Sequence, residues 1–259
     1  MDFLIELLFR LLLNVPIVRL IFVAVLPSIL LIRYVWKKDR LEPEPPKLVW
    51  SLVGLGVVSV LPVMALELGG LAALEHVFKE ENFLYLIVHW FLVVGVSEEF
   101  CKYMMMRLKT WKCRDFNCFF DAMVYSAAVS AGFALAENLM YGLKYGISVL
   151  FVRALVSIPA HICFSVFMGA WYGSAKRFAA AGDLNRARRA HILSVAIPAA
   201  AHGAFDLLAS NADSTPALAF FLIYVAAMFI FCWRMLKNQA EKDAYFSGGP
   251  EEGNRPREA

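Results

Sequence analysis

Charged residues are scarce in this sequence, and their scarcity determines the class of protein. Lys, Arg, Asp and Glu make up 18 % of the 259 residues, and apolar residues make up 60 %. Soluble domains average about 25 % charged and about 45–50 % apolar residues. The composition therefore excludes a soluble domain and predicts a chain that crosses a lipid bilayer several times. We expect no nucleic acid among its partners.

The sequence also has no two cysteines in C-x-x-C spacing. Its five cysteines are Cys101, Cys113, Cys118, Cys163 and Cys232. The close pair, Cys113 and Cys118, falls in a basic loop that we place in the cytoplasm, where thiols stay reduced. This usage speaks against a disulfide framework and against a zinc ribbon.

The two ends of the sequence differ from its apolar middle. The start lacks the basic stretch and the small-residue cleavage site of a signal peptide. Charged residues recur there at every fourth position among leucines and phenylalanines, which predicts an amphipathic interfacial segment over residues 1–15. Residues 237–259 carry many charges, which predicts a disordered cytoplasmic tail. Between these ends, residues 16–236 are expected to form a single transmembrane helical domain.

Seven stretches are long and apolar enough to cross a bilayer core, which takes about 20 residues of helix. They lie near residues 16–36, 48–74, 83–106, 118–141, 147–175, 190–210 and 216–236. Because lipid offers no partners to backbone polar groups, they predict an all-α bundle of about seven transmembrane helices. Basic residues concentrate in alternate loops, so the positive-inside rule predicts an external N-terminus and a cytoplasmic C-terminus. Residues 40–46, rich in proline, predict a stiff connector without further function.

Ionisable side chains interrupt four successive spans. An ionised side chain at the bilayer centre costs about 2.5–3.5 kcal/mol on insertion scales, so such residues mark a functional site. They are Glu98, Glu99 and Lys102 in the third span, Glu137 with Asn138 in the fourth, Arg153 and His161 in the fifth, and His202 and Asp206 in the sixth. We therefore expect the active site in the core formed by spans three to six. Glu67, His76 and His89 are assigned to interface or loop roles.

Residue counting adds two details. Glu137 falls nearer the outer face than the other acids, so we expect the fourth span to begin near Ala122 and end near Tyr145. In the fifth span, polar and small residues recur at every fourth position from Arg153 onward, which predicts one polar helix face. Pro159 is expected to interrupt that helix.

Three glutamates and two histidines suit the activation of water for amide hydrolysis. In a metal version, Glu137, His161 and His202 form the three-ligand set of a catalytic zinc, with water at the open position. Either Glu98 or Glu99 then acts as the general base.

A version without a metal uses the same residues. Glu98 and Glu137 share a proton and activate water, while His202 stabilises the oxyanion. The residues expected to orient these groups are Asn138, Arg153 and Asp206. Helix geometry turns Glu98 and Glu99 about 100° apart, so one of them is expected to face the water and the other to pair with Lys102. The sequence leaves their assignment open.

Four motifs in chain order resemble those of the PrsW family of intramembrane metalloproteases. They are Glu98-Glu99-x-x-Lys102, Phe133-x-x-x-Glu137-Asn138, His161-x-x-Phe164 with Gly169, and His202-x-x-x-Asp206. The family is similar to the CAAX-prenyl protease and bacteriocin-processing group, whose second motif ends in histidine. Glu137 at that position favours the PrsW branch.

The resemblance implies an intramembrane endopeptidase of the bacterial plasma membrane that hydrolyses membrane-anchored proteins, such as anti-sigma factors. It also implies zinc as the cofactor. The residues to which it gives functional roles are Glu98, Glu99, Lys102, Glu137, His161 and His202.

A proton- or ion-coupled transporter is the main alternative, because carboxylates and histidines in membrane helices also relay protons. The sequence shows no inverted repeat of broken helices, which counts against it. A non-catalytic binding protein is disfavoured by the intact set of acids and histidines. A cysteine protease is disfavoured because Cys163 lies two residues from His161 and faces away from it on a helix.

Overall fold

The computed structural model describes residues 16–246, which form helices and loops without a β-strand. The helices are α2 (Pro16–Trp36), α3 (Pro46–Val77), α4 (Phe83–Ile87), the π-helix η1 (Val88–Val96), α5 (Ser97–Thr110), α6 (Asp121–Tyr145), α7 (Ile147–Leu155), α8 (Ser157–Ala180), α9 (Leu184–Ser210) and α10 (Thr215–Glu241). Within this part, six spans are long and apolar enough to cross a membrane. Together with α6 they correspond to the seven expected spans, and the predicted all-α membrane bundle is confirmed.

The expected terminal segments are described only in part. The interfacial segment over residues 1–15 lies outside the described residues, as do residues 247–259 of the expected tail. The first residues of that tail continue α10 through Glu241. Beyond it, the backbone N–H of Phe246 donates to the carbonyl of Asn117 at 2.9 Å, so the chain returns to the loop before α6.

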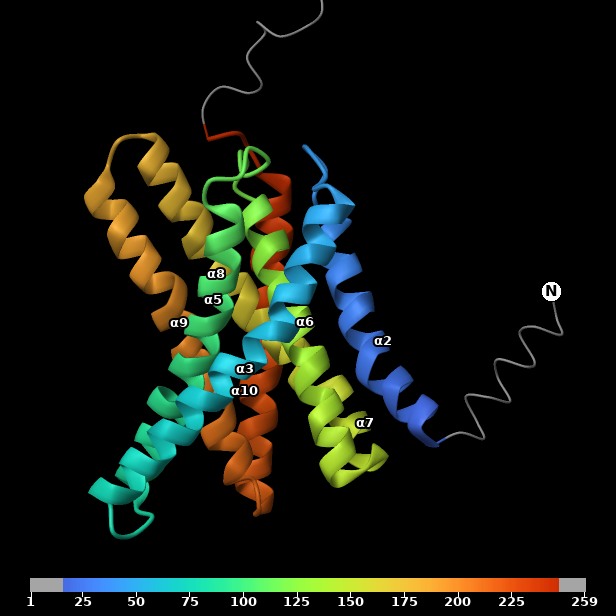
Figure 1. The fold of residues 1–259 in the computed structure, drawn as a ribbon, viewed down its shortest axis with the longest axis vertical. Coiled ribbons are helices and arrows are strands. Elements are labelled where there is room, and N and C mark those ends of the chain that lie inside the picture. Colours follow the sequence, from blue (N-terminus) through green and yellow to red (C-terminus); the bar gives the residue numbers. More distant parts are fainter. Residues whose placement is uncertain (1–15, 247–259) are drawn as a thin grey trace, which may run out of the picture.

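Helix α6 occupies the middle of the bundle, where it packs against α2, α3 and α8 (Figure 1). Every residue from Asp121 to Ala134 is buried, and most of these residues are small. A Cβ at Gly132 would lie 2.0 Å from the carbonyl oxygen of Val53, so glycine is what lets α3 cross α6 this closely. The limits of α6, Asp121 and Tyr145, match the shift that residue counting predicted.

The fifth span is divided into α7 and α8. The break falls at Val156, with φ of −119° and ψ of −61°. Pro159 lies in the first turn of α8 and has no amide hydrogen to donate to the carbonyl of Leu155. The predicted interruption is therefore confirmed. The predicted polar face is therefore divided between two helices, although Arg153, Ser157 and His161 still line one common cavity.

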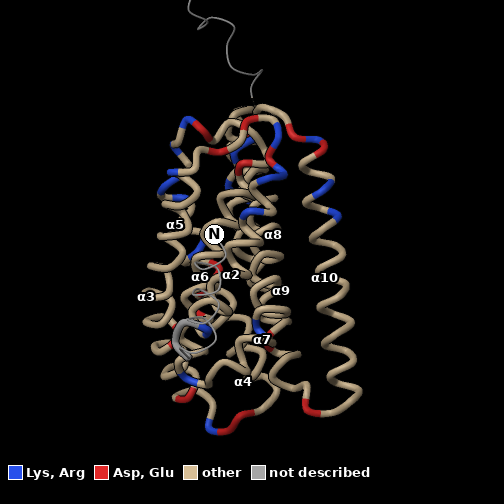
Figure 2. Tube along the Cα trace, turned by 90° about the vertical axis from the view of Figure 1, so that its right-hand side faces the viewer, with Lys and Arg blue, Asp and Glu red and all other residues tan. Residues whose placement is uncertain are grey.

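Lys and Arg residues gather at one end of the bundle, at the top of Figure 2. We call it the basic end, and it consists of the loops 37–45, 111–120 and 181–183 with the end of α10. The loops 78–82 and 211–214 lie at the opposite end. The alternation of loops agrees with consecutive membrane spans.

The Pro-rich connector between α2 and α3 is anchored at the basic end. Trp36 Nε1 donates to the carbonyl of Glu44 at 3.1 Å, and Asn117 Nδ2 donates to Glu42 Oε2 at 3.0 Å. The side chains of Asp39 and Glu44 are buried. The connector expected from its prolines is therefore held against the bundle, with Glu44 buried and Glu42 exposed.

Candidate active site

The start of α5, from Glu98 to Lys102, places two carboxylates and an ammonium group on one side of a helix. It directly follows η1, and π-helical segments are frequent at functional sites. Lys102 Nζ lies 2.9 Å from Glu98 Oε2 and 2.8 Å from Glu99 Oε1, because residues three and four apart share a helix face. Both carboxylates thus contact Lys102, where the sequence suggested only one. The side chains are buried, with exposed fractions of 5 % for Glu98, 0 % for Glu99 and 1 % for Lys102.

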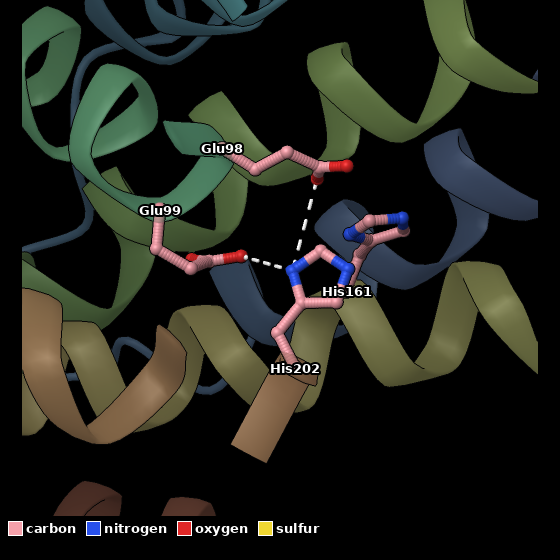
Figure 3. A group of neighbouring side chains, drawn as sticks. All are labelled: Glu98, Glu99, His161 and His202. Carbon is pink, nitrogen blue, oxygen red and sulfur yellow. Dashed lines mark hydrogen bonds and ion pairs between the residues drawn. The ribbon is translucent and has the colours of Figure 1, made fainter. Parts of the chain in front are cut away.

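Helix α9 brings His202 against this turn (Figure 3). His202 Nδ1 lies 3.0 Å from Glu99 Oε1 and 3.7 Å from Glu98 Oε2. Its other ring nitrogen, Nε2, lies 3.2 Å from Asp206 Oδ2, one helical turn later. A Cβ at the neighbouring Gly203 would lie 2.7 Å from the backbone of η1, so glycine permits the close approach of α9 that positions His202.

Helices α8 and α6 supply the second histidine and its carboxylate. Lys102 Nζ donates to His161 Nδ1 at 3.3 Å, and His161 Nε2 donates to Glu137 Oε2 at 2.9 Å. Arg153 pairs with the same Glu137 oxygen at 2.7 Å and donates through Nε to Asn138 Oδ1 at 2.6 Å. Arg153 therefore links Asn138 to Glu137. Glu137 in turn contacts His161, which contacts Lys102 of α5.

The two histidines share one arrangement. Nδ1 of each ring faces the charged turn of α5, and Nε2 of each faces a carboxylate outside it, Glu137 for His161 and Asp206 for His202. We call Glu137 and Asp206 the outer carboxylates. Carboxylates in this position fix the orientation and tautomer of metal-binding histidines.

A cavity of about 670 Å³ opens onto these groups. Its ionisable wall consists of Glu67, Glu98, Glu137, Arg153, His161, His202 and Asp206. Glu99 and Lys102 lie behind this wall. On the side away from the basic end, the cavity reaches Ser210, the last residue of α9, and Leu218 in the first turn of α10. The side chains of the cluster therefore face a cavity that lies in the half of the bundle opposite the basic end.

Glu67 is the residue that sequence reasoning missed. It lies half-buried on α3 and lines the cavity, although we assigned it to the interface. It is the single acid within residues 48–74, so the argument that singled out Glu98 applies equally to it. His89 lines a smaller cavity of about 300 Å³ that shares Glu67 with the larger one. His76 is exposed at the end of α3, in agreement with an interface role.

Four side chains could together hold a metal ion. They are Glu98, Glu99, His161 and His202. One ligand atom of each lies within 4.8 Å of the others, and imidazole and carboxylate are donors that zinc accepts. Glu99 Oε2 is buried without a partner among the described residues, so the donor set fits a metal. Glu137 lies outside this group, because its Oε2 contacts His161 and Arg153.

Comparison with known proteins gives one consistent result. Residues 44–234 match the model of the PrsW family intramembrane metalloproteases. Protease PrsW of Bacillus subtilis is 31 % identical over 220 residues, which cover 83 % of this chain and 91 % of that protein. Protease PrsW of Geobacillus kaustophilus is 33 % identical over 190 residues, 73 % of this chain and 79 % of that protein. No solved structure matches the chain.

Proposed function

The chain belongs to the PrsW family of intramembrane metalloproteases, and from this premise we propose that it hydrolyses membrane-anchored proteins at the cluster of Glu98, His161 and His202. The observation that carries the proposal is the convergence of these side chains, from three helices, on one wall of a cavity inside a membrane bundle. Apolar side chains such as Leu218, Phe221 and Leu222 also line the cavity, which suits a substrate that is anchored in the bilayer.

Glu98 is the proposed general base, because it lines the cavity whereas Glu99 is fully buried behind it. Its carboxylate would take a proton from the attacking water and pass it to the leaving amine. Lys102 holds this carboxylate in place at 2.9 Å and compensates its charge. In the version without a metal, His202 with Asp206 is the proposed group that stabilises the oxyanion on the peptide carbonyl.

Zinc is the metal that we propose for the site. His161 and His202 would hold it together with a carboxylate oxygen of Glu99, which leaves Glu98 as the base, while the outer carboxylates orient the two rings. When bound, zinc lowers the pKa of a water and polarises the peptide carbonyl. Lys102 Nζ contacts the same glutamate oxygens, so zinc and this ammonium compete for them. If no metal binds, Lys102 remains the counter-charge of a glutamate-type protease.

The topology supports a proposal for the side of cleavage. The basic end, which includes the end of α10, would face the cytoplasm of a bacterial cell by the positive-inside rule. The cavity extends away from this end, so cleavage is proposed in the outer half of the plasma membrane. Membrane-anchored proteins of the anti-sigma-factor class are the proposed substrates, on the resemblance of the motifs.

Cleavage of a single-span substrate by the purified protein in detergent tests the proposal. Glu98→Gln keeps the size of the side chain but removes the base, and we expect cleavage to fall by about 100-fold or more. Glu75→Gln, at an exposed position of α3 outside the cavity, is the matched control and is expected to retain full activity. Equal cleavage by wild type and Glu98→Gln would contradict the assignment.

Elemental analysis of the same protein distinguishes the metal version from the glutamate version. About one zinc per chain, lost in His202→Ala, would support the metal site. Full activity of metal-free protein would support the glutamate version instead.

A further inference from the structure

A second group of buried acids lies at the basic end, outside the proposed active site. Asp39 and Glu44 come from the connector before α3, and Asp121 is the first residue of α6. Their exposed fractions are 4 %, 3 % and 1 %. One oxygen of each lies within 4.8 Å of the others. Asp121 and Glu137 are separated by 16 residues of α6, about 24 Å of helix, so the two acidic sites are distinct.

Each of these carboxylates uses one oxygen within the protein. Asp39 Oδ2 accepts from the backbone N–H of Glu44 at 3.2 Å, and Glu44 Oε1 accepts from the hydroxyl of Tyr125 at 2.6 Å. Asp121 Oδ2 accepts from the backbone N–H of Cys118 at 2.6 Å. These bonds hold the three carboxyl groups in fixed positions.

The second oxygen of each carboxylate is left without a partner. Among residues 16–246, Asp39 Oδ1, Glu44 Oε2 and Asp121 Oδ1 are buried and accept no hydrogen bond. An unsatisfied buried carboxylate oxygen is costly, since it has lost water without gaining a donor. Three such oxygens in one cluster indicate that a positively charged ligand belongs there.

Basic side chains do not fill that role, although Lys and Arg are plentiful at this end (Figure 2). In the described part of the chain, none of the three acids forms an ion pair with Lys, Arg or His. A fourth acid, Asp243, stands nearby: its Oδ1 accepts from the backbone N–H of Phe120 at 2.9 Å, and its Oδ2 is buried without a partner. The cluster thus gathers four acidic side chains without a basic partner in the described part of the chain.

We propose that Asp39, Glu44 and Asp121 bind a hard divalent cation, Mg²⁺ or Ca²⁺, at the basic end. The donor set consists of carboxylate oxygens without sulfur or imidazole, which is the set that these two cations prefer. The bound cation ties the connector between α2 and α3 to the start of α6. It thereby fixes the first turns of α3 and α6 relative to each other. These are the helices whose Glu67 and Glu137 line the cavity. The inference rests on these contacts alone and holds whatever reaction the chain catalyses.

Terbium(III), a hard cation that prefers oxygen ligands, is the probe for this site. The rings of Tyr125 and Trp36 lie beside this site, because Tyr125 donates to the carboxylate of Glu44 and Trp36 donates to its backbone carbonyl. Ultraviolet light absorbed by these rings can be transferred to a bound terbium ion, which then emits. We expect terbium luminescence from the chelator-treated full chain in detergent, and its displacement by Mg²⁺ or Ca²⁺. The cation that displaces terbium at the lower concentration is the better ligand. Failure of both cations to displace any terbium signal would overturn the proposal.

Variants locate the signal. Asp39→Asn and Asp121→Asn each remove one anionic ligand and are expected to weaken binding by roughly 10-fold or more. Glu80→Gln, in the exposed loop at the opposite end, is the matched control. Glu98→Gln is expected to retain binding, which separates this site from the active site. Undiminished binding in both aspartate variants would also overturn the proposal.

A thermal scan of wild-type protein gives an answer even if a variant fails to fold. Saturating Mg²⁺ or Ca²⁺ is expected to raise the Tm of chelator-treated wild type near neutral pH. An unchanged Tm would show that protons alone neutralise the cluster, and that result would also refute the cation site.

Discussion

Lys102→Met would leave two buried carboxylates without the ammonium group that they share. Lys102 Nζ lies 2.9 Å from Glu98, 2.8 Å from Glu99 and 4.1 Å from the ring centre of Phe133. Removing one partner of a buried ion pair costs about 3–5 kcal/mol, because the remaining charge stays in a medium of low dielectric. Since two charges remain here, we expect a loss near the upper end, about 4–5 kcal/mol. That is a large share of the stability of about 5–15 kcal/mol that is typical of a folded domain.

Denaturant unfolding of the purified protein in detergent measures this loss. The matched comparison is the triple variant Glu98→Gln, Glu99→Gln and Lys102→Met, which carries more substitutions but no buried charge in the turn. If the loss comes from uncompensated charge, the triple variant is more stable than Lys102→Met alone. A loss below about 1 kcal/mol, the size of an exposed ion pair, would refute the reasoning. Zinc that stabilises Lys102→Met more than wild type would show that metal and ammonium compete for the same oxygens.

Three further predictions concern other parts of the molecule. Asp206→Asn takes the outer carboxylate from His202 Nε2, and kcat on a single-span substrate is expected to fall about 10–100-fold while the unfolding transition stays in place; an unchanged kcat would argue against this orienting role. Gly132→Ala places a methyl group against the carbonyl oxygen of Val53 and is expected to cost about 1–3 kcal/mol in denaturant unfolding. Gly54→Ala, where nothing lies within 4 Å, is its control. Burial raises the pKa of Asp39 to about 6 and that of Glu44 to about 9. In chelator the folded chain then binds more protons than the unfolded one, so its stability falls as pH rises between about pH 4 and about pH 9, and thermal scans across this window measure the slope.

The helices could be predicted from the sequence because lipid imposes strict rules. A bilayer requires long apolar helices, so apolar stretches located the seven spans, with limits that differ from those of the helices by up to about six residues. The expected move of the fourth span to Ala122 and Tyr145 also succeeded, because bringing Glu137 level with the other acids requires it. The break before Pro159 followed from the missing amide hydrogen of proline.

The features that escaped prediction depend on contacts between distant segments. Glu67 was set aside because its depth was counted along one helix, whereas the cavity extends past the middle of the bundle to reach it. The contact of Arg153 with Glu137 also joins two different helices, and residue spacing does not reveal it. The connector looked like a linker because neither Asp39 nor Glu44 reveals in sequence that it will meet Asp121, some 80 residues later, in the folded protein.

The enclosed position of α6 has a consequence for how the protein is made. The small and polar residues let α6 fit between α2, α3 and α8, and α6 is not among the six described spans whose length and composition by themselves suit a membrane crossing. On its own in lipid, α6 would hold Glu137 and Asn138 without the partners that Arg153 and His161 supply. Its entry into the bilayer therefore depends on neighbours that have already been synthesised, α2 and α3 first, with α8 completing the enclosure. Substitutions on the small-residue face of α6 are accordingly expected to reduce cellular abundance through failed assembly and quality control, even where every group of the cavity wall is intact.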